Sequence, residues 1–160
     1  MKDIHLITIE VNGTAHELVV ESRRTLADVL RQDIGLTGTH LGCEHGICGA
    51  CTVLLDDEPI RACLVFGVQA DGRKVRTVEG LAVGDQLSDL QQAFSRNHAL
   101  QCGFCTPGFL MLAEAYLADG PDPDAEQARE VVAANLCRCT GYQGIVDAVT
   151  EVAASRQQAR

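Results

Sequence analysis

The chain has no tryptophan, and aromatic residues make up only 4% of it, which excludes a large aromatic core in either half. No apolar run approaches the roughly 18 residues that span a bilayer, and the N-terminus contains no signal core, twin arginine or cleavage site. Acidic side chains outnumber basic ones, and the net charge is −9. We therefore expect no membrane span, no binding of nucleic acid and a cytoplasmic location.

Cysteine, in contrast, is abundant, with eight residues in a chain of 160. The first set follows C-x4-C-x2-C-x11-C at Cys43, Cys48, Cys51 and Cys63, and the second set follows C-x2-C-x31-C-x-C at Cys102, Cys105, Cys137 and Cys139. Four thiolates are the ligand number of a [2Fe-2S] cluster. Cysteine groups in a reducing compartment are more often metal sites than disulfides. The two sets therefore predict two one-electron centres and a role in electron transfer, with no substrate pocket.

The first half of the chain has the alternating pattern of strands. The Asn12-Gly13 pair predicts a hairpin turn, and apolar residues at helical spacing predict one helix over residues 25–34. A glycine-rich loop follows at 38–51. The expected strands are Ile4–Val11, His16–Val20, Thr52–Leu55, Ile60–Phe66 and an edge strand, Lys74–Val78.

The second half changes to helical spacing. Thr106 is expected to be an N-cap, followed by Pro107 in the first turn of its helix, and Asp124 is expected to cap the next one. The four expected helices are Ser88–Asn97, one that starts at Thr106, Ala125–Leu136 and Ile145–Ala154. Four short helices predict a bundle, with a boundary between the halves near Glu79–Gly84.

The C-x4-C-x2-C spacing of the first set is that of plant-type ferredoxins. Gly46 and Gly49 permit the tight turns that bring backbone N–H groups to sulfur. A structural zinc site is the main alternative, although zinc sites favour paired C-x2-C knuckles. A Rieske centre that uses His45 is disfavoured because four cysteines complete the set, so His45 is interpreted as a surface loop residue.

The second set places Cys102 and Cys105 directly before a predicted helix N-terminus, where free N–H groups and the helix dipole favour negative charge. An extended C-x-C segment would send Cys137 and Cys139 to opposite faces, so this segment must curl in order to ligate one cluster. Spacing alone is less specific here than in the first set, and zinc remains open as the alternative.

Three segments together resemble a known family: GCEHGICGACTV, QCGFCTPG and NLCRCTGY. They are similar to the iron–sulfur subunits of the molybdenum hydroxylases, the xanthine dehydrogenase family, which includes carbon monoxide dehydrogenase and bacterial aldehyde and N-heterocycle hydroxylases. The resemblance covers the chain from about Ile4 to Ala154. It implies an α+β fold: an N-terminal β-grasp, plant-type ferredoxin domain at residues 1–78, a linker at 79–84, and a C-terminal four-helix bundle domain at 85–160.

The same resemblance implies the cofactors. The first set would ligate a [2Fe-2S] cluster distal from the molybdenum, and the second set a proximal one. Gln101 would contact the molybdopterin, whose form would be the cytosine dinucleotide; the chemical alternative is that Gln101 only caps the cluster loop. The glycines expected to be cofactor-binding are Gly42, Gly46, Gly49 and Gly103.

The chain has no flavin or molybdenum domain, so the resemblance implies partners. They are a large molybdopterin subunit and a medium FAD subunit, in a dimer of heterotrimers. The chain would pass electrons from the first partner to the second, or to an external acceptor, and it would hold no catalytic residue of its own. A freely diffusing ferredoxin and a zinc-stabilised interaction module remain as alternatives.

Overall fold

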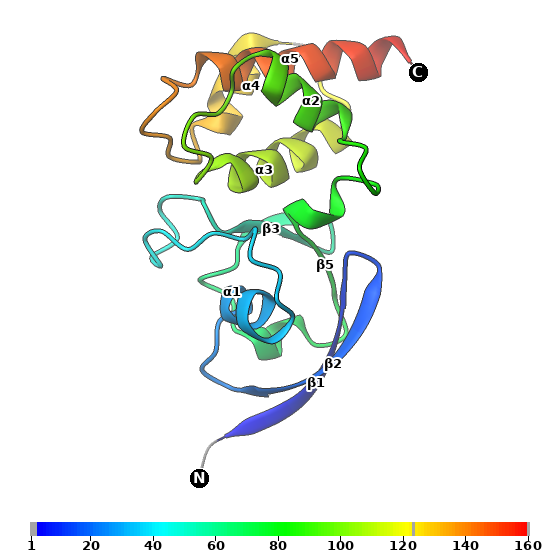
Figure 1. Cartoon of the computed structure of the whole chain (residues 1–160), viewed down its shortest axis with the longest axis vertical. Coiled ribbons are helices and arrows are strands. Elements are labelled where there is room, and N and C mark those ends of the chain that lie inside the picture. The colour runs from blue at the N-terminus through cyan, green and yellow to red at the C-terminus, as the bar shows by residue number, and fades with distance from the viewer. Residues whose placement is uncertain (1–2, 123, 160) are drawn as a thin grey trace.

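A mixed five-stranded sheet forms the N-terminal half of the computed structural model, which describes residues 3–122 and 124–159 (Figure 1). The strand order is β2-β1-β5-β3-β4. Strands β1 and β5 run parallel, and the other neighbours run antiparallel. The strands are β1 (Ile4–Val11), β2 (Thr14–Glu21), β3 (Thr52–Leu55), β4 (Glu58–Arg61) and β5 (Lys74–Arg76).

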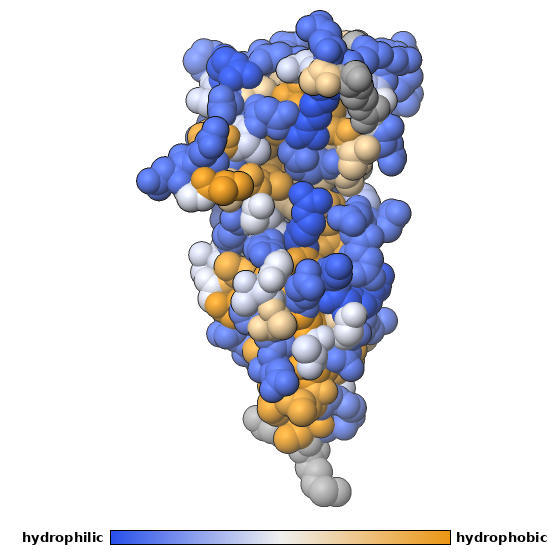
Figure 2. All heavy atoms as spheres, turned by 90° about the vertical axis from the view of Figure 1, so that its right-hand side faces the viewer, coloured by the Kyte–Doolittle hydropathy of each residue, from blue (hydrophilic) through white to orange (hydrophobic). Residues whose placement is uncertain are grey.

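The predicted hairpin joins β1 to β2. Asn12 and Gly13 have φ angles of 51° and 80°, which a tight hairpin turn with two left-handed positions requires. Alternation then buries Ile7, Ile9 and Val11 on the inner face of β1. On the outer face Ile4, Leu6 and Val19 are exposed, and Figure 2 shows apolar side chains gathered at the narrow N-terminal end.

Three predictions for this half were wrong in detail. Strand β5 is not an edge strand, because it pairs with both β1 and β3. The expected helix divides into α1 (Leu26–Asp28), which Thr25 caps, and a π-helix, η1 (Val29–Asp33). Strand β4 ends at Arg61, so Cys63 lies on a turn. Two short 3-10 helices, η2 (Gly67–Ala70) and η3 (Val78–Gly80), flank β5.

The four predicted helices of the C-terminal half are present as α2 (Asp89–Arg96), α3 (Thr106–Ala118), α4 (Ala125–Val132) and α5 (Gln143–Gln158). Ser88 and Asp124 cap α2 and α4. Thr106 is the first residue of α3 and Cys105 occupies the N-cap position, so the expected Thr106 cap was wrong. Helix α4 ends four residues before the expected end, because residues 134 and 135 tighten into i→i−3 hydrogen bonds.

Each half has its own apolar core, and β3 contributes to both. Val53 and Leu55 pack in the sheet core with α1, whereas Leu54 packs in the helical core with Phe109 of α3. Helix α3 therefore covers the outer face of β3, as Figure 1 shows. Leu81, in the predicted linker, also joins the helical core. The boundary at 79–84 stays a prediction, but the α+β architecture of a sheet half followed by a helical half is confirmed. Over the described residues, no helix has the length and apolar character that crossing a membrane requires.

The guanidinium of Arg156 connects three helices of the bundle through ion pairs. Arg156 of α5 makes two 2.8 Å hydrogen bonds to the carboxylate of Asp89 in α2 and lies 3.1 Å from Glu114 Oε1 in α3. The Glu114 side chain is only 10% exposed. The hydrogen bond from Arg156 holds the pKa of Asp89 below its usual value. A buried carboxylate is stable only when it is paired in this way.

We predict that Arg156→Met lowers the free energy of unfolding by roughly 3 kcal/mol, because it leaves Glu114 buried without a counter-charge. The matched control is Arg96→Met, which breaks an exposed pair with Glu151 and is expected to cost about 0–1 kcal/mol. Adding Glu114→Gln to Arg156→Met should restore part of the loss. Chemical denaturation measures the free energy of unfolding of all three variants. Equal losses of this free energy in Arg156→Met and Arg96→Met would contradict a special role for the Arg156 ion pairs.

Candidate metal centres

The first set lies in the loop that precedes β3 and on the turn that follows β4. Gly46 and Gly49 have φ angles of 76° and 74°, the left-handed conformation that glycine adopts without strain. These turns aim backbone N–H groups inward: His45 N and Cys48 N lie 3.4 and 3.3 Å from Cys43 Sγ. Hydrogen bonds from Cys48 and then His45 lower the pKa of the Cys43 thiol to about 6. The loop thus stabilises a thiolate.

Contacts connect all four cysteines of the first set. Cys48 N donates a hydrogen bond to Cys43 Sγ, and the Cys63 thiol lies close enough to Cys51 to affect its pKa. Cys48 and Cys51 are also close enough to interact electrostatically. Cys51 and Cys63 are 2% and 8% exposed, and burial raises the pKa of Cys51 to about 11. Such a buried thiol ionises readily only when a cation such as iron binds it.

The second set lies at the N-terminus of α3 and in the loop that follows α4. Cys139 Sγ is 3.7 Å from Cys102 Sγ, and the Cys137 thiol lies close enough to Cys105 to affect its pKa. Burial and the Cys137 thiol raise the pKa of Cys105 to about 12. The position of Cys105 at the helix N-terminus therefore does not lower its pKa. For Cys137, burial is outweighed by hydrogen bonds from the Thr140 hydroxyl and backbone, which lower its pKa. The C-x-C segment curls as predicted.

The donor sets fit [2Fe-2S] clusters. All eight cysteines are free thiols, which excludes the disulfide alternative in this structure, and the contacts above join cysteines within a set. Backbone N–H groups of His45, Cys48 and Thr140 point to sulfur, as an anionic cluster requires. In the described part of the chain, no three His, Cys, Asp or Glu side chains converge to hold a single metal ion.

The remaining predicted site residues lie around these loops. His45 is exposed and bonds through Nδ1 to the Cys43 carbonyl, so it is a surface loop residue. Gln101 is also exposed, beside Cys102. A Cβ on Gly42 would lie 3.1 Å from Cys48 Sγ, so this glycine packs against a thiol. Gly103 has a φ of 82° with open space around it.

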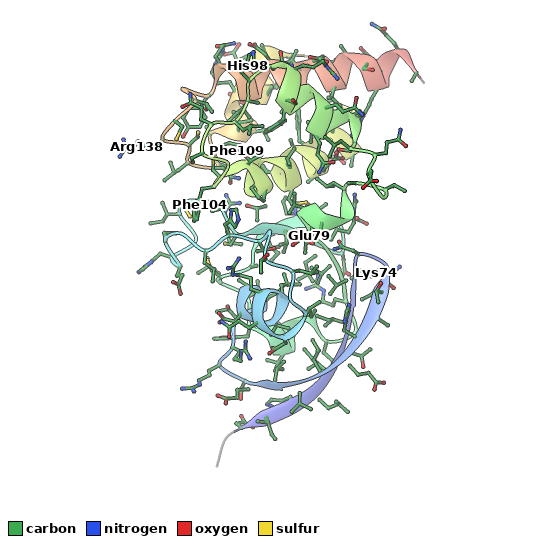
Figure 3. All side chains as sticks on the ribbon, in the orientation of Figure 1. Lys74, Glu79, His98, Phe104, Phe109 and Arg138 are labelled. Atoms are coloured by element: carbon green, nitrogen blue, oxygen red, sulfur yellow. The ribbon has the colours of Figure 1, made fainter. Side chains whose placement is uncertain are left out.

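Sequence reasoning missed the residues that support the second set. The Tyr142 hydroxyl accepts a hydrogen bond from Cys137 N at 2.9 Å and donates one to the Asn135 carbonyl at 3.3 Å. Its ring packs edge-on against Phe109 at 6.1 Å. Tyr142 thereby fixes the C-x-C loop on helix α3. Arg138, between the two cysteines, is exposed and points away from the helices (Figure 3).

The two cysteine loops contact each other directly. Leu136 N donates to the Cys48 carbonyl at 2.9 Å, and Arg61 Nη2 donates to the Ala134 carbonyl at 2.7 Å. On the other side of the loops the His40 ring stacks on Phe104 at 4.9 Å, and His40 Nδ1 lies 2.7 Å from the Phe104 carbonyl. Figure 3 shows Phe104 between the halves. Hydrogen bonds therefore fix the first set relative to the second.

Comparison with known proteins agrees with this geometry. A family model for a 2Fe-2S iron-sulfur cluster binding domain matches residues 9–82, and a model for a [2Fe-2S] binding domain matches residues 77–150. The nicotine 6-hydroxylase small subunit of Paenarthrobacter nicotinovorans is 57% identical, over 91% of this chain and 87% of its own length. Caffeine dehydrogenase subunit gamma of Pseudomonas sp. strain CBB1 is 52% identical, over 98% and 95%.

A solved structure, that of quinoline 2-oxidoreductase from Pseudomonas putida 86, matches with a TM-score of 0.94 and 49% identity. The match covers 99% of this chain and 98% of the other. The chain belongs to the iron–sulfur subunits of the molybdenum hydroxylases. As a member of this family it has two [2Fe-2S] domains that fit two clusters, and it is an electron-transfer component of an enzyme.

We predict that Cys51→Ser removes one of two paramagnetic signals from the reduced subunit and leaves the other. The two sets differ in burial and hydrogen bonding, so their spectra should differ. Electron paramagnetic resonance of the dithionite-reduced chain measures this, with Cys105→Ser as the matched variant in the other set. Loss of both signals, or of neither, in Cys51→Ser would contradict the division of ligands.

Proposed function

We propose that this chain conducts electrons from a molybdopterin hydroxylase subunit to a FAD subunit or an external acceptor. In this proposal Cys43, Cys48, Cys51 and Cys63 ligate the distal cluster, and Cys102, Cys105, Cys137 and Cys139 ligate the proximal one. When bound, each cluster supplies a centre that takes up and releases one electron. The observation that carries the assignment is the exposure of the second set, where Cys102, Cys139 and Gln101 all reach the surface.

Exposed apolar side chains lie near both cysteine loops in the sequence and support docking of partner proteins. Leu100, Phe104 and Leu136, beside the second set, are 41%, 48% and 54% exposed. Ile47, Leu64 and Phe66, beside the first set, are 68%, 60% and 48% exposed. Exposed apolar residues gathered around a functional loop are typical of protein interfaces. The exposed apolar residues beside the two cysteine loops therefore favour docking of partner proteins over this region.

The partners follow from the family and from these exposed apolar residues. The relatives named above are a small subunit and a subunit gamma, which supports a complex of several chains. We propose a large subunit with molybdopterin in its cytosine dinucleotide form and a medium subunit with FAD, in a dimer of heterotrimers. Eight free thiols are compatible with the reducing cytoplasm as the site of this complex.

We predict about four irons and four acid-labile sulfides per chain, because two four-thiolate sets each hold a [2Fe-2S] cluster. Metal analysis of the anaerobically purified subunit measures this, together with visible absorbance. Zinc in place of iron at either set would refute the proposed electron path, and a colourless protein would favour the zinc-stabilised module.

A substitution of Gln101 tests whether electrons enter the chain at the second cysteine set. The exposed amide of Gln101 lies next to Cys102, where it can hydrogen-bond to a docked pterin, each bond being worth roughly 1 kcal/mol. We predict that Gln101→Ala leaves both clusters assembled but slows their reduction by substrate in the assembled enzyme, or weakens retention of molybdopterin. Reduction of the isolated subunit by dithionite should not change.

The matched control is Gln158→Ala, a glutamine exposed at the far end of α5, which should behave as wild type in both assays. If the Gln101→Ala enzyme turns over at the wild-type rate with full molybdenum content, Gln101 serves only as a cap on the cluster loop. The entry point for electrons would then lie elsewhere.

A further inference from the structure

Asn135 is buried with an unused side-chain amide. The residue is 1% exposed, and within the described residues neither Nδ2 nor Oδ1 has a hydrogen-bond partner. Its backbone is satisfied, because its N–H bonds to Val132 and its carbonyl accepts from Tyr142. Burying an amide without partners is costly, so native proteins provide a partner for nearly every such group. The protein chain alone does not provide one here.

The side chain of Asn135 extends from the second cysteine loop into the first. A Cβ placed on Gly49 would lie 1.9 Å from Asn135 Oδ1 and 3.1 Å from Asn135 Cβ, so the amide lies directly against the Gly49 backbone. Gly49 stands between Cys48 and Cys51. The next residue, Leu136, donates its N–H to the Cys48 carbonyl at 2.9 Å, which holds the segment in place.

A cluster bound by the first set would supply an acceptor for the unpaired Nδ2 of Asn135. The amide presents two N–H donors on Nδ2 and an acceptor at Oδ1. Oδ1 lies nearest to Gly49, but among the described residues neither atom has a partner that fixes the amide. A half-turn about the Cβ–Cγ bond exchanges the two atoms and brings Nδ2 to the first loop. An iron–sulfur cluster brings anionic sulfur atoms into the space that its loop encloses, and such sulfurs accept N–H hydrogen bonds. The backbone already supplies donors of this kind at Cys43. A side-chain donor at Gly49 would add one from the opposite half of the molecule.

We propose that Asn135 donates a hydrogen bond from Nδ2 to a sulfur of the cluster held by the first set, and thereby raises the reduction potential of that cluster. The reduced cluster carries one more negative charge, so a donor stabilises it more than the oxidised form. Asn135 is thus a positioning and tuning residue that belongs to the loop of one cluster and acts on the other. The inference rests on the proposed ligand assignment of the first set.

The test compares Asn135→Ala and Asn135→Asp with wild type in the full chain with its clusters. The asparagine-to-aspartate change keeps the size, removes the donor and adds a negative charge. Potentials of both clusters are measured by titration monitored with electron paramagnetic resonance, and signals are assigned with Cys51→Ser. The first-set potential should fall in the order wild type, Ala, Asp, and the second-set potential should shift less.

Arg61→Met is the matched control. Arg61 binds the Ala134 carbonyl next to Asn135, so this variant loosens the same contact but keeps the amide. It should lower the melting temperature and leave the first-set potential near the wild-type value.

Four outcomes would overturn the inference, and the first three are unchanged potentials, a shift confined to the second set, and a shift in Arg61→Met as large as that in Asn135→Ala. Loss of iron from both Asn135 variants would also overturn it, because the amide would then be needed to build the loop. Iron analysis on the same samples separates this inference from the proposed function. Wild-type protein without iron refutes the function, whereas full iron with unchanged potentials refutes only the role of Asn135.

Discussion

The close approach of the two cysteine loops at Gly49 is the constraint on which the rest of the structure depends. A Cβ on Gly108 would lie 2.2 Å from the Gly49 carbonyl oxygen, and a Cβ on Gly49 would lie 1.9 Å from Asn135. Neither contact leaves room for a side chain, so helix α3 and the second loop can pack on the first loop only while both positions are glycine. Separation of the loops would also separate the two metal centres that electrons must cross.

Burial then gives the two sets different environments on one short chain. Cys51 and Cys63 are enclosed by the sheet core, whereas Cys102 and Cys139 are exposed. Solvent exposure and hydrogen bonds to sulfur both tune the potential of an iron–sulfur cluster. The loop of the sheet half and the helix terminus of the other half differ in solvent exposure and in hydrogen bonds to sulfur. The two centres can therefore have different reduction potentials although all their ligands are cysteines.

The sequence predicted the elements whose signals are local. The alternation of Ile4–Val11, the Asn12-Gly13 turn and the Asp124 cap specify structure within a few residues, and all three are present. The central position of β5 could not be predicted, because its pairing with β1 joins residues far apart in the chain. The π-helix η1 was missed because it covers only five residues, about one turn, over which the apolar spacing of a π-helix and of an α-helix hardly differ.

The grouping of the cysteines into two ligand sets stays a prediction, which rests on ligand number and on the short motifs C-x4-C-x2-C, C-x2-C and C-x-C. The groups that support the cysteine loops could not be predicted. An asparagine two residues before a cysteine has the pattern of an ordinary loop residue, and its burial depends on Gly49 in the other half. His40 likewise contacts the Phe104 carbonyl in the second cysteine loop, and Leu136 N donates a hydrogen bond to the Cys48 carbonyl in the first. Because each cysteine loop contacts groups from the other half, neither half alone holds its cysteine loop in the conformation seen here. This exchange gives a physical reason for the two domains to form one chain.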